Sequence, residues 1–213
     1  MSTVSIKSSG RAGWSWIVMT GMLGTLLSTF AVANLSTWTK TNRPIGLGVI
    51  VMELVVVGAY VLRRQPIVVS RSAFAWIAAG LGAFGLVLAR PHYLPVGGDD
   101  YEILYMSLQL GSALLAIASV LTLGRSFGVV AANRGIKTRG PYRIVRHPIY
   151  ASYLVGMVGY ALENPSFRNL ILFSTVIGFQ VARIRSEEQC LLDDPEYRSY
   201  KRRVRYRLVP FVY

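Results

Sequence analysis

The chain has 213 residues, of which 53% are hydrophobic and 15% charged, and its 23 Lys and Arg residues outnumber 10 Asp and Glu residues. A soluble domain carries about 25% charged residues, and disorder requires low hydrophobicity, so neither class fits. Cys190 is the only cysteine, which excludes a disulfide scaffold. The composition therefore predicts an integral membrane protein whose basic residues report its orientation.

Long apolar runs separate the basic residues. A helix needs about 20 mostly apolar residues to cross the hydrocarbon core. Four runs reach or approach this length: 14–35, 45–62, 73–89 and 103–123. A fifth apolar region, 149–182, is interrupted by Glu163-Asn164-Pro165-Ser166. Because Asn-Pro is a turn signal, this region predicts a hairpin with short arms over 149–162 and 167–182.

The positions of Lys and Arg predict the topology. Six helices with both chain ends inside place 19 basic residues on the cytoplasmic side and 4 on the other, as the positive-inside rule requires. We therefore expect an all-α fold: a polytopic transmembrane bundle of about six helices, the last two forming the short hairpin, with a cytoplasmic C-terminal helical cap. Membrane lipids are then direct partners, in a bacterial plasma or inner membrane or a eukaryotic endoplasmic reticulum.

Two features of the first half leave alternatives open. Ala31-Val32-Ala33 resembles a signal-peptidase site, so removal of the first run is the alternative to a first span. Glu53 lies in the middle of the second run, where an ionisable residue is a functional candidate. Pairing of Glu53 inside the bundle is an equally good explanation.

The first polar cluster runs from Gly140 to Tyr150. Gly140-Pro141 predicts a turn, and Pro148 predicts the start of a helix, with Arg146 and His147 at its N-terminus. Such a helix end carries free N–H groups and favours an anion. Tyr142 and Tyr150 add flat faces for stacking. The alternative is that Arg146 anchors the membrane end and His147 caps the helix.

The second cluster, 183–191, continues from the last apolar arm. Arg183 and Glu187 are four residues apart, and Arg185 and Glu188 three, which is typical of a helix surface with ion pairs. The functional alternative is a pair of carboxylates at a cavity mouth. Adjacent acids point about 100° apart on a helix, so one would hold ribose hydroxyls and the other would orient a neighbour or lie near a cation.

The remaining polar residues give no sign of metal or nucleic-acid chemistry. Residues 195–210 mix basic and aromatic side chains, which next to a membrane exit favours a helix on anionic headgroups over nucleic-acid binding. Cysteine, histidine and acidic residues lack zinc spacing. Cys190 has no partner cysteine and is expected to pack in the core.

The clusters together resemble the isoprenylcysteine carboxyl methyltransferase superfamily, which includes bacterial members and phospholipid N-methyltransferases. The resemblance rests, over roughly 120–213, on the ordered set Gly140-Pro141-Tyr142, Arg146-His147-Pro148, Tyr150, Glu187-Glu188, Tyr197, Tyr200 and Tyr206-Arg207-Leu208-Val209-Pro210. It implies an integral membrane S-adenosylmethionine-dependent methyltransferase. Residues 101–213 would then form the catalytic region with the cofactor site, and residues 1–100 the scaffold and substrate side.

The resemblance also implies residue roles. The expected cofactor-binding residues are Gly124, Tyr142, Arg146, His147, Pro148, Tyr150, Glu187 and Glu188. Arg146, His147 and Glu187 are also expected to be catalytic. The cofactor would enter from the cytoplasm and a lipophilic, lipidated or small amphiphilic acceptor from the bilayer. The acceptor atom would belong to a carboxylate, a thiol or an amine, and we expect neither a metal nor a nucleic acid.

Two other functions remain open at this point. Membrane sterol reductases, which use NADPH, share an Arg-His-Pro-x-Tyr motif and a tail like Glu188-Gln189-Cys190, but they have more transmembrane helices than the six expected here. The second is a non-enzymatic membrane assembly or heme-associated factor. His92 and His147 are expected on opposite sides of the membrane, so they would not ligate one heme iron together.

Overall fold

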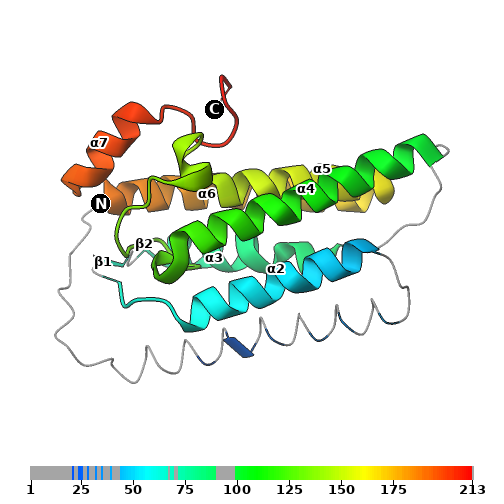
Figure 1. Cartoon of the computed structure of the whole chain (residues 1–213), viewed down its shortest axis with the longest axis horizontal. Helices are drawn as coiled ribbons and strands as arrows, with labels where there is room; N and C mark the ends of the chain where they lie inside the picture. The colour runs from blue at the N-terminus through cyan, green and yellow to red at the C-terminus, as the bar shows by residue number, and fades with distance from the viewer. Residues whose placement is uncertain are drawn as a thin grey trace.

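The computed structural model describes residues 44–66, 68–69, 72–89 and 99–212, with isolated helical positions between 21 and 39. Apart from those isolated positions, the predicted first span and its alternative signal-peptidase site lie outside the described residues, as does His92. Helices make up most of the described chain, as Figure 1 shows. The α-helices are α2 (Pro44–Val61), α3 (Ala73–Phe84), α4 (Asp99–Leu123), α5 (Pro148–Glu163), α6 (Phe167–Leu191) and α7 (Pro195–Arg203).

Short elements lie between the helices. The 3-10 turns are η1 (Gly85–Leu88), η2 (Gly124–Ser126) and η3 (Gly140–Arg143). No strand pair is expected from the sequence, but β1 (Val68–Val69) and β2 (Ala132–Asn133) form an antiparallel pair. This pair joins the segment after α2 to the loop after α4, and that loop bounds the site described below.

The predicted hairpin is present, formed by α5 and α6. Pro148 begins α5, where its missing N–H costs nothing. Ser166 begins α6 by accepting a hydrogen bond from the Asn169 amide at 3.1 Å. The apolar arm predicted over 167–182 continues without a break to Leu191, as the spacing of the second cluster predicted. The polar cluster 183–191 is therefore part of the same helix as the apolar arm.

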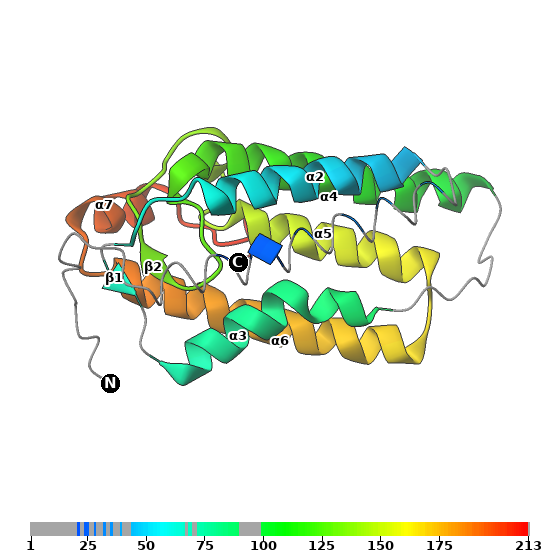
Figure 2. The ribbon, with the colours of Figure 1, turned by 90° about the horizontal axis from the view of Figure 1, so that it is seen from below.

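The helices form an elongated bundle. In Figure 2, α2 and α4 lie on one side, α3 and α6 on the other, and α5 between them. Helices α4 and α5 approach closely at Gly159. A Cβ atom there would come within 2.9 Å of Gln109 Cγ and 3.0 Å of the Tyr105 carbonyl oxygen. A small residue is what lets two helices pack this tightly in a membrane-type bundle.

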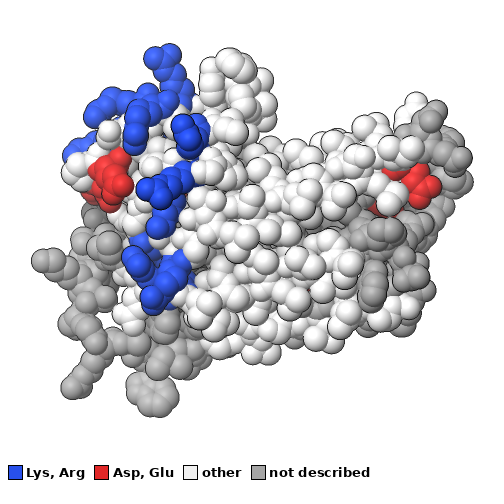
Figure 3. All heavy atoms as spheres, viewed as in Figure 1, with Lys and Arg blue, Asp and Glu red and all other residues white. Residues whose placement is uncertain are grey.

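Two helical stretches of the described chain are long and apolar enough to cross a membrane, Tyr101–Ser126 and Phe167–Leu191. Shorter apolar helices cover Gly46–Val61 and Ala73–Ala83. Large apolar side chains such as Ile103, Leu121 and Phe167 are more than 60% exposed. Figure 3 shows Lys and Arg gathered at the end that holds α7, with a broad uncharged surface beside them. This distribution is typical of a protein with a lipid-facing belt.

Candidate functional site

A cavity of about 170 Å³ lies at the basic end of the bundle. Its walls are the loop 126–137, the turn η3, the beginning of α5, the last turns of α6 and one face of α7. Helices α2 and α3 add apolar wall through Val56 and Ala83. The cavity is therefore polar toward the loops and apolar toward the bundle.

Glu187 lines this cavity, and its carboxylate meets two side chains of α5 and its N-terminus. Tyr150 donates its hydroxyl hydrogen to Glu187 Oε1. His147 Nδ1 lies 3.7 Å from Glu187 Oε2. Among the described residues, neither Arg183–Glu187 nor Arg185–Glu188 forms an ion pair, so the helix-surface alternative considered from the sequence is wrong for these two pairs.

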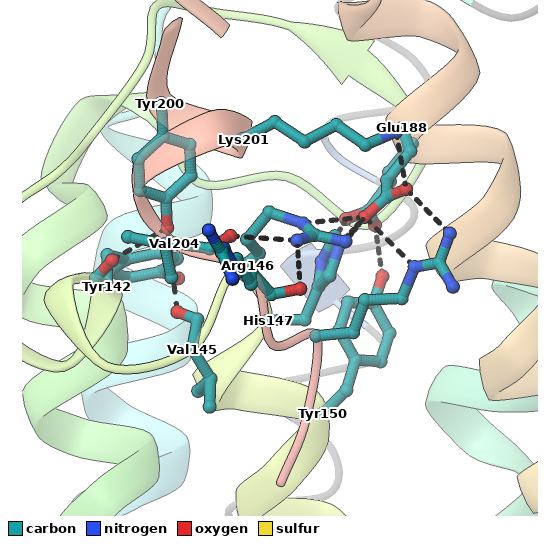
Figure 4. A network of polar contacts seen from close by, with 12 residues as sticks. Tyr142, Val145, Arg146, His147, Tyr150, Glu188, Tyr200, Lys201 and Val204 are labelled. Atoms are coloured by element: carbon teal, nitrogen blue, oxygen red, sulfur yellow. Dashed lines mark hydrogen bonds and ion pairs between the residues drawn. The ribbon is translucent and has the colours of Figure 1, made fainter. Parts of the chain in front are cut away.

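Glu188 has a different environment, at the centre of the network in Figure 4. Its side chain is 5% exposed and accepts hydrogen bonds from Arg146 Nε at 2.9 Å and from Arg207 Nε and Nη2 at 3.2 and 3.1 Å. His147 Nε2 lies 3.4 Å away and Lys201 Nζ 3.6 Å away. Glu188 therefore ties α6 to the beginning of α5, to α7 and to the C-terminal segment.

The beginning of α5 differs from the expectation of free N–H groups. The Arg146 amide donates to the Tyr206 carbonyl and the His147 amide to the Arg207 carbonyl, both at 2.9 Å. The Arg146 guanidinium donates to the Val204 and Arg205 carbonyls at 2.8 and 2.6 Å as well as to Glu188. Backbone carbonyls of residues 204–207 thus accept hydrogen bonds from the Arg146 and His147 donors that were expected to bind an anion.

Three tyrosines pack together on the loop side. Tyr142, Tyr197 and Tyr200 form one buried cluster, and the Tyr200 hydroxyl donates to the Tyr142 carbonyl at 2.7 Å. Burial raises the pKa of Tyr142 well above its ordinary value, and nearby Glu187 adds to this, so the phenol is neutral. The hydroxyl of Tyr197 is buried without a hydrogen-bond partner.

Two arginines that line the cavity were not among the predicted site residues. Arg134 directly follows β2, and its guanidinium lies against Gly128, which belongs to the loop between α4 and β2. Burial lowers the pKa of Arg134 to about 10, against an opposing effect of Glu187, so this side chain is a cation at neutral pH. Arg183 projects from α6 and is 7% exposed. Both Nε atoms are buried without a partner.

The predicted site residues separate into two groups. Tyr142, Arg146, His147, Tyr150 and Glu187 line the cavity. Gly124, in η2, Pro148, at the beginning of α5, and Glu188 are not among the residues that line it. Glu53 does not line this cavity, and its Oε2 atom is buried. Within the described ranges, no group of three or more His, Cys, Asp or Glu is placed to hold a metal ion.

The sequence of this region matches a known family. Residues 103–194 match the phospholipid methyltransferase family. The family in turn is part of the isoprenylcysteine carboxyl methyltransferase-like superfamily, as the ordered motifs indicated. The matched segment covers most of α4 and all of α5 and α6, and so includes Arg146, His147 and Glu187. No protein with a curated description matches the chain.

The match to this family over residues 103–194 indicates a membrane methyltransferase. The matched segment supplies most of the cavity, whereas Val56, Ala83, Tyr197 and Tyr200 come from outside it. The superfamily was visible in the sequence because its motifs are short and local. Arg134 had no such signal, because only the fold of the loop places it against the last turns of α6.

Proposed function

We propose that this protein is an integral membrane methyltransferase that uses S-adenosylmethionine and methylates a lipophilic or small amphiphilic acceptor at the cytoplasmic face. The observation that carries the proposal is the cavity built mostly from the segment that matches the methyltransferase family, which combines one carboxylate, cations and aromatic faces. When bound, S-adenosylmethionine supplies a methyl group on a positively charged sulfur. Three buried polar atoms without partners, on Arg134, Arg183 and Tyr197, support a polar ligand in this space.

The residues around the cavity suit the parts of that cofactor. Glu187 would accept hydrogen bonds from ribose hydroxyls, and Tyr142 and Tyr150 would pack against flat or cationic groups. Arg134, at the loop side, would pair with a carboxylate. Arg146 and Glu188 would hold this wall in place rather than bind the cofactor directly, since their polar atoms are already engaged.

The acceptor determines whether a base is needed. A carboxylate is already a nucleophile, whereas a thiol or an amine must lose a proton. His147 and Glu187 line the cavity and are the candidate bases. Glu188 is a poor candidate, because four side chains around its carboxylate favour the charged form.

The first test is calorimetric titration of the purified protein with S-adenosylhomocysteine and, in parallel, with NADPH. We expect micromolar binding of S-adenosylhomocysteine alone. Glu187→Gln should weaken it about 10- to 100-fold, the loss of a hydrogen bond to a charged group. Glu196→Gln, which changes an exposed carboxylate on α7, is the matched control. Binding of NADPH alone would replace the proposal with a reductase, and normal binding by Glu187→Gln would remove Glu187 from the site.

A further inference from the structure

A basic arm, residues 195–212, follows the segment that matches the methyltransferase family. It consists of α7 and the tail after it, and Figure 1 shows both at the cavity end, projecting from the same side of the bundle. Six of its side chains are Lys or Arg and one is acidic. Three residues separate α7 from the end of α6, a candidate membrane span. The basic arm therefore begins just beyond a helix that can cross the membrane.

Helix α7 has two different sides. The inner side carries Tyr197 and Tyr200, which are 2% and 3% exposed. Lys201 also turns inward, and its Nζ lies 3.6 Å from Glu188 Oε2. The outward side of α7 and the first residues of the tail carry four exposed arginines, none of which forms an ion pair with a described residue: Arg198, Arg202, Arg203 and Arg205. These outward charges are available to an anionic partner outside the chain.

The tail returns to the depth at which the apolar part of α5 begins. The Arg146 amide donates to the Tyr206 carbonyl at 2.9 Å, and Leu208 is buried among side chains of α5 and α6. Arg207 ties the same stretch to α6 by donating to Glu188 Oε2 at 3.1 Å. Because the apolar run predicted to enter the membrane begins at 149, the tail lies where the boundary of the hydrocarbon core is expected.

Beyond Leu208, the tail exposes apolar side chains. Val209, Phe211 and Val212 are 44%, 88% and 79% exposed. The Val212 amide donates to the Val209 carbonyl at 3.2 Å, which closes a turn. Phe211 has a φ of 68° in this turn, a value that a bulky residue rarely adopts, and its ring centre lies 5.2 Å from that of Tyr206. The turn thus presents an apolar, aromatic surface outward, and aromatic residues are favoured at a membrane interface.

We propose that the basic arm binds the membrane surface at the cavity end, with its outward arginines on anionic phospholipid headgroups and the turn 209–212 inserted below them. Basic side chains near an anionic leaflet strengthen binding, and apolar residues beside them add burial in the interface. An acidic protein or a nucleic acid would match the arginines but leave the turn in water. A second copy of the chain would cover the turn but bring six like charges. This inference is independent of the proposed function, because it uses no ligand of the cavity.

The test is the fluorescence of the full chain in nanodiscs, with nitrobenzoxadiazole attached to Val212→Cys. The emission of this dye increases when it leaves water. With about one-third phosphatidylglycerol, we expect emission about twofold stronger than in phosphatidylcholine alone, and about 1 M salt should cancel the difference because it screens exposed charges. The wild-type chain measures labelling of the buried Cys190. Equal emission in the two lipids would overturn the proposal. A dye that is not quenched by a nitroxide near the start of the lipid acyl chain would overturn it as well.

Variants assign the binding to the basic arm. Arg202→Gln combined with Arg203→Gln should remove most of the increase, because each basic side chain near an anionic surface changes the binding constant about fivefold. Arg139→Gln combined with Arg143→Gln changes two exposed arginines outside the arm and should leave the increase in place. An equal loss in both double variants would assign the anionic lipid to the whole basic end and reject the role of the arm. Emission that increases with protein concentration in lipid-free detergent would assign the turn to a second copy instead.

Discussion

Adjacent acidic residues in α6 have opposite environments, and this decides what each can do. Glu187 faces the cavity and is engaged from one side by Tyr150 and His147. Glu188 is 4% exposed and surrounded by basic side chains of α7, the C-terminal segment and the N-terminus of α5. We therefore expect ligand binding to depend on the first carboxylate and folding on the second.

The Glu188→Gln variant tests the structural role. Removing the charge leaves the Arg146 guanidinium, whose side chain is 4% exposed, without its counter-ion. Breaking a buried pair in this way costs about 3–5 kcal/mol, which should lower the melting temperature by on the order of 10 °C. Thermal unfolding followed by circular dichroism measures the shift. Asp193→Asn changes an exposed acid just beyond α6 and is the control. A melting temperature of Glu188→Gln within about 2 °C of wild type would contradict the structural role of Glu188.

Packing between α4 and α5 depends on a small side chain at one position. We expect Gly159→Ala to destabilise the protein by about 1–3 kcal/mol, because the added Cβ meets the α4 backbone and cannot be accommodated by a rotamer change. Gly111→Ala on α4 has no atom within 4 Å of the new Cβ and should be neutral or slightly stabilising. Chemical or thermal unfolding of both variants in the same detergent gives the comparison. Equal stability of the two variants would mean that α4 and α5 are further apart than described.

Helices and their local motifs could be predicted from the sequence, whereas contacts between distant segments could not. The run 45–62 and the proline at 148 set helix bounds close to those of α2 and α5. The apolar arm predicted over 167–182 and the polar cluster predicted to continue from it form one helix, α6, whose charged residues at 183–191 include Glu187 in the cavity and Glu188 against the C-terminal segment. The Tyr206 and Arg207 carbonyls that cover the beginning of α5 are about 60 residues away in sequence, and no periodicity or spacing reports such a contact.

At the scale of the whole molecule, the cavity, α7 and most of the basic surface lie at one end, and the α5–α6 turn lies at the other (Figures 1 and 3). The positive-inside bias predicts that the cavity end faces the cytoplasm.

Single cysteines test the orientation of the cavity end directly, since the native Cys190 is buried. Ser199→Cys on α7 and Phe167→Cys at the beginning of α6 place a thiol on an exposed position at each end. In spheroplasts, a membrane-impermeant maleimide should label Phe167→Cys at once and Ser199→Cys only after lysis. The wild-type chain measures the background from Cys190. The reverse pattern would place the cavity outside, where cytoplasmic S-adenosylmethionine could not reach it, and would remove the proposed function together with the topology.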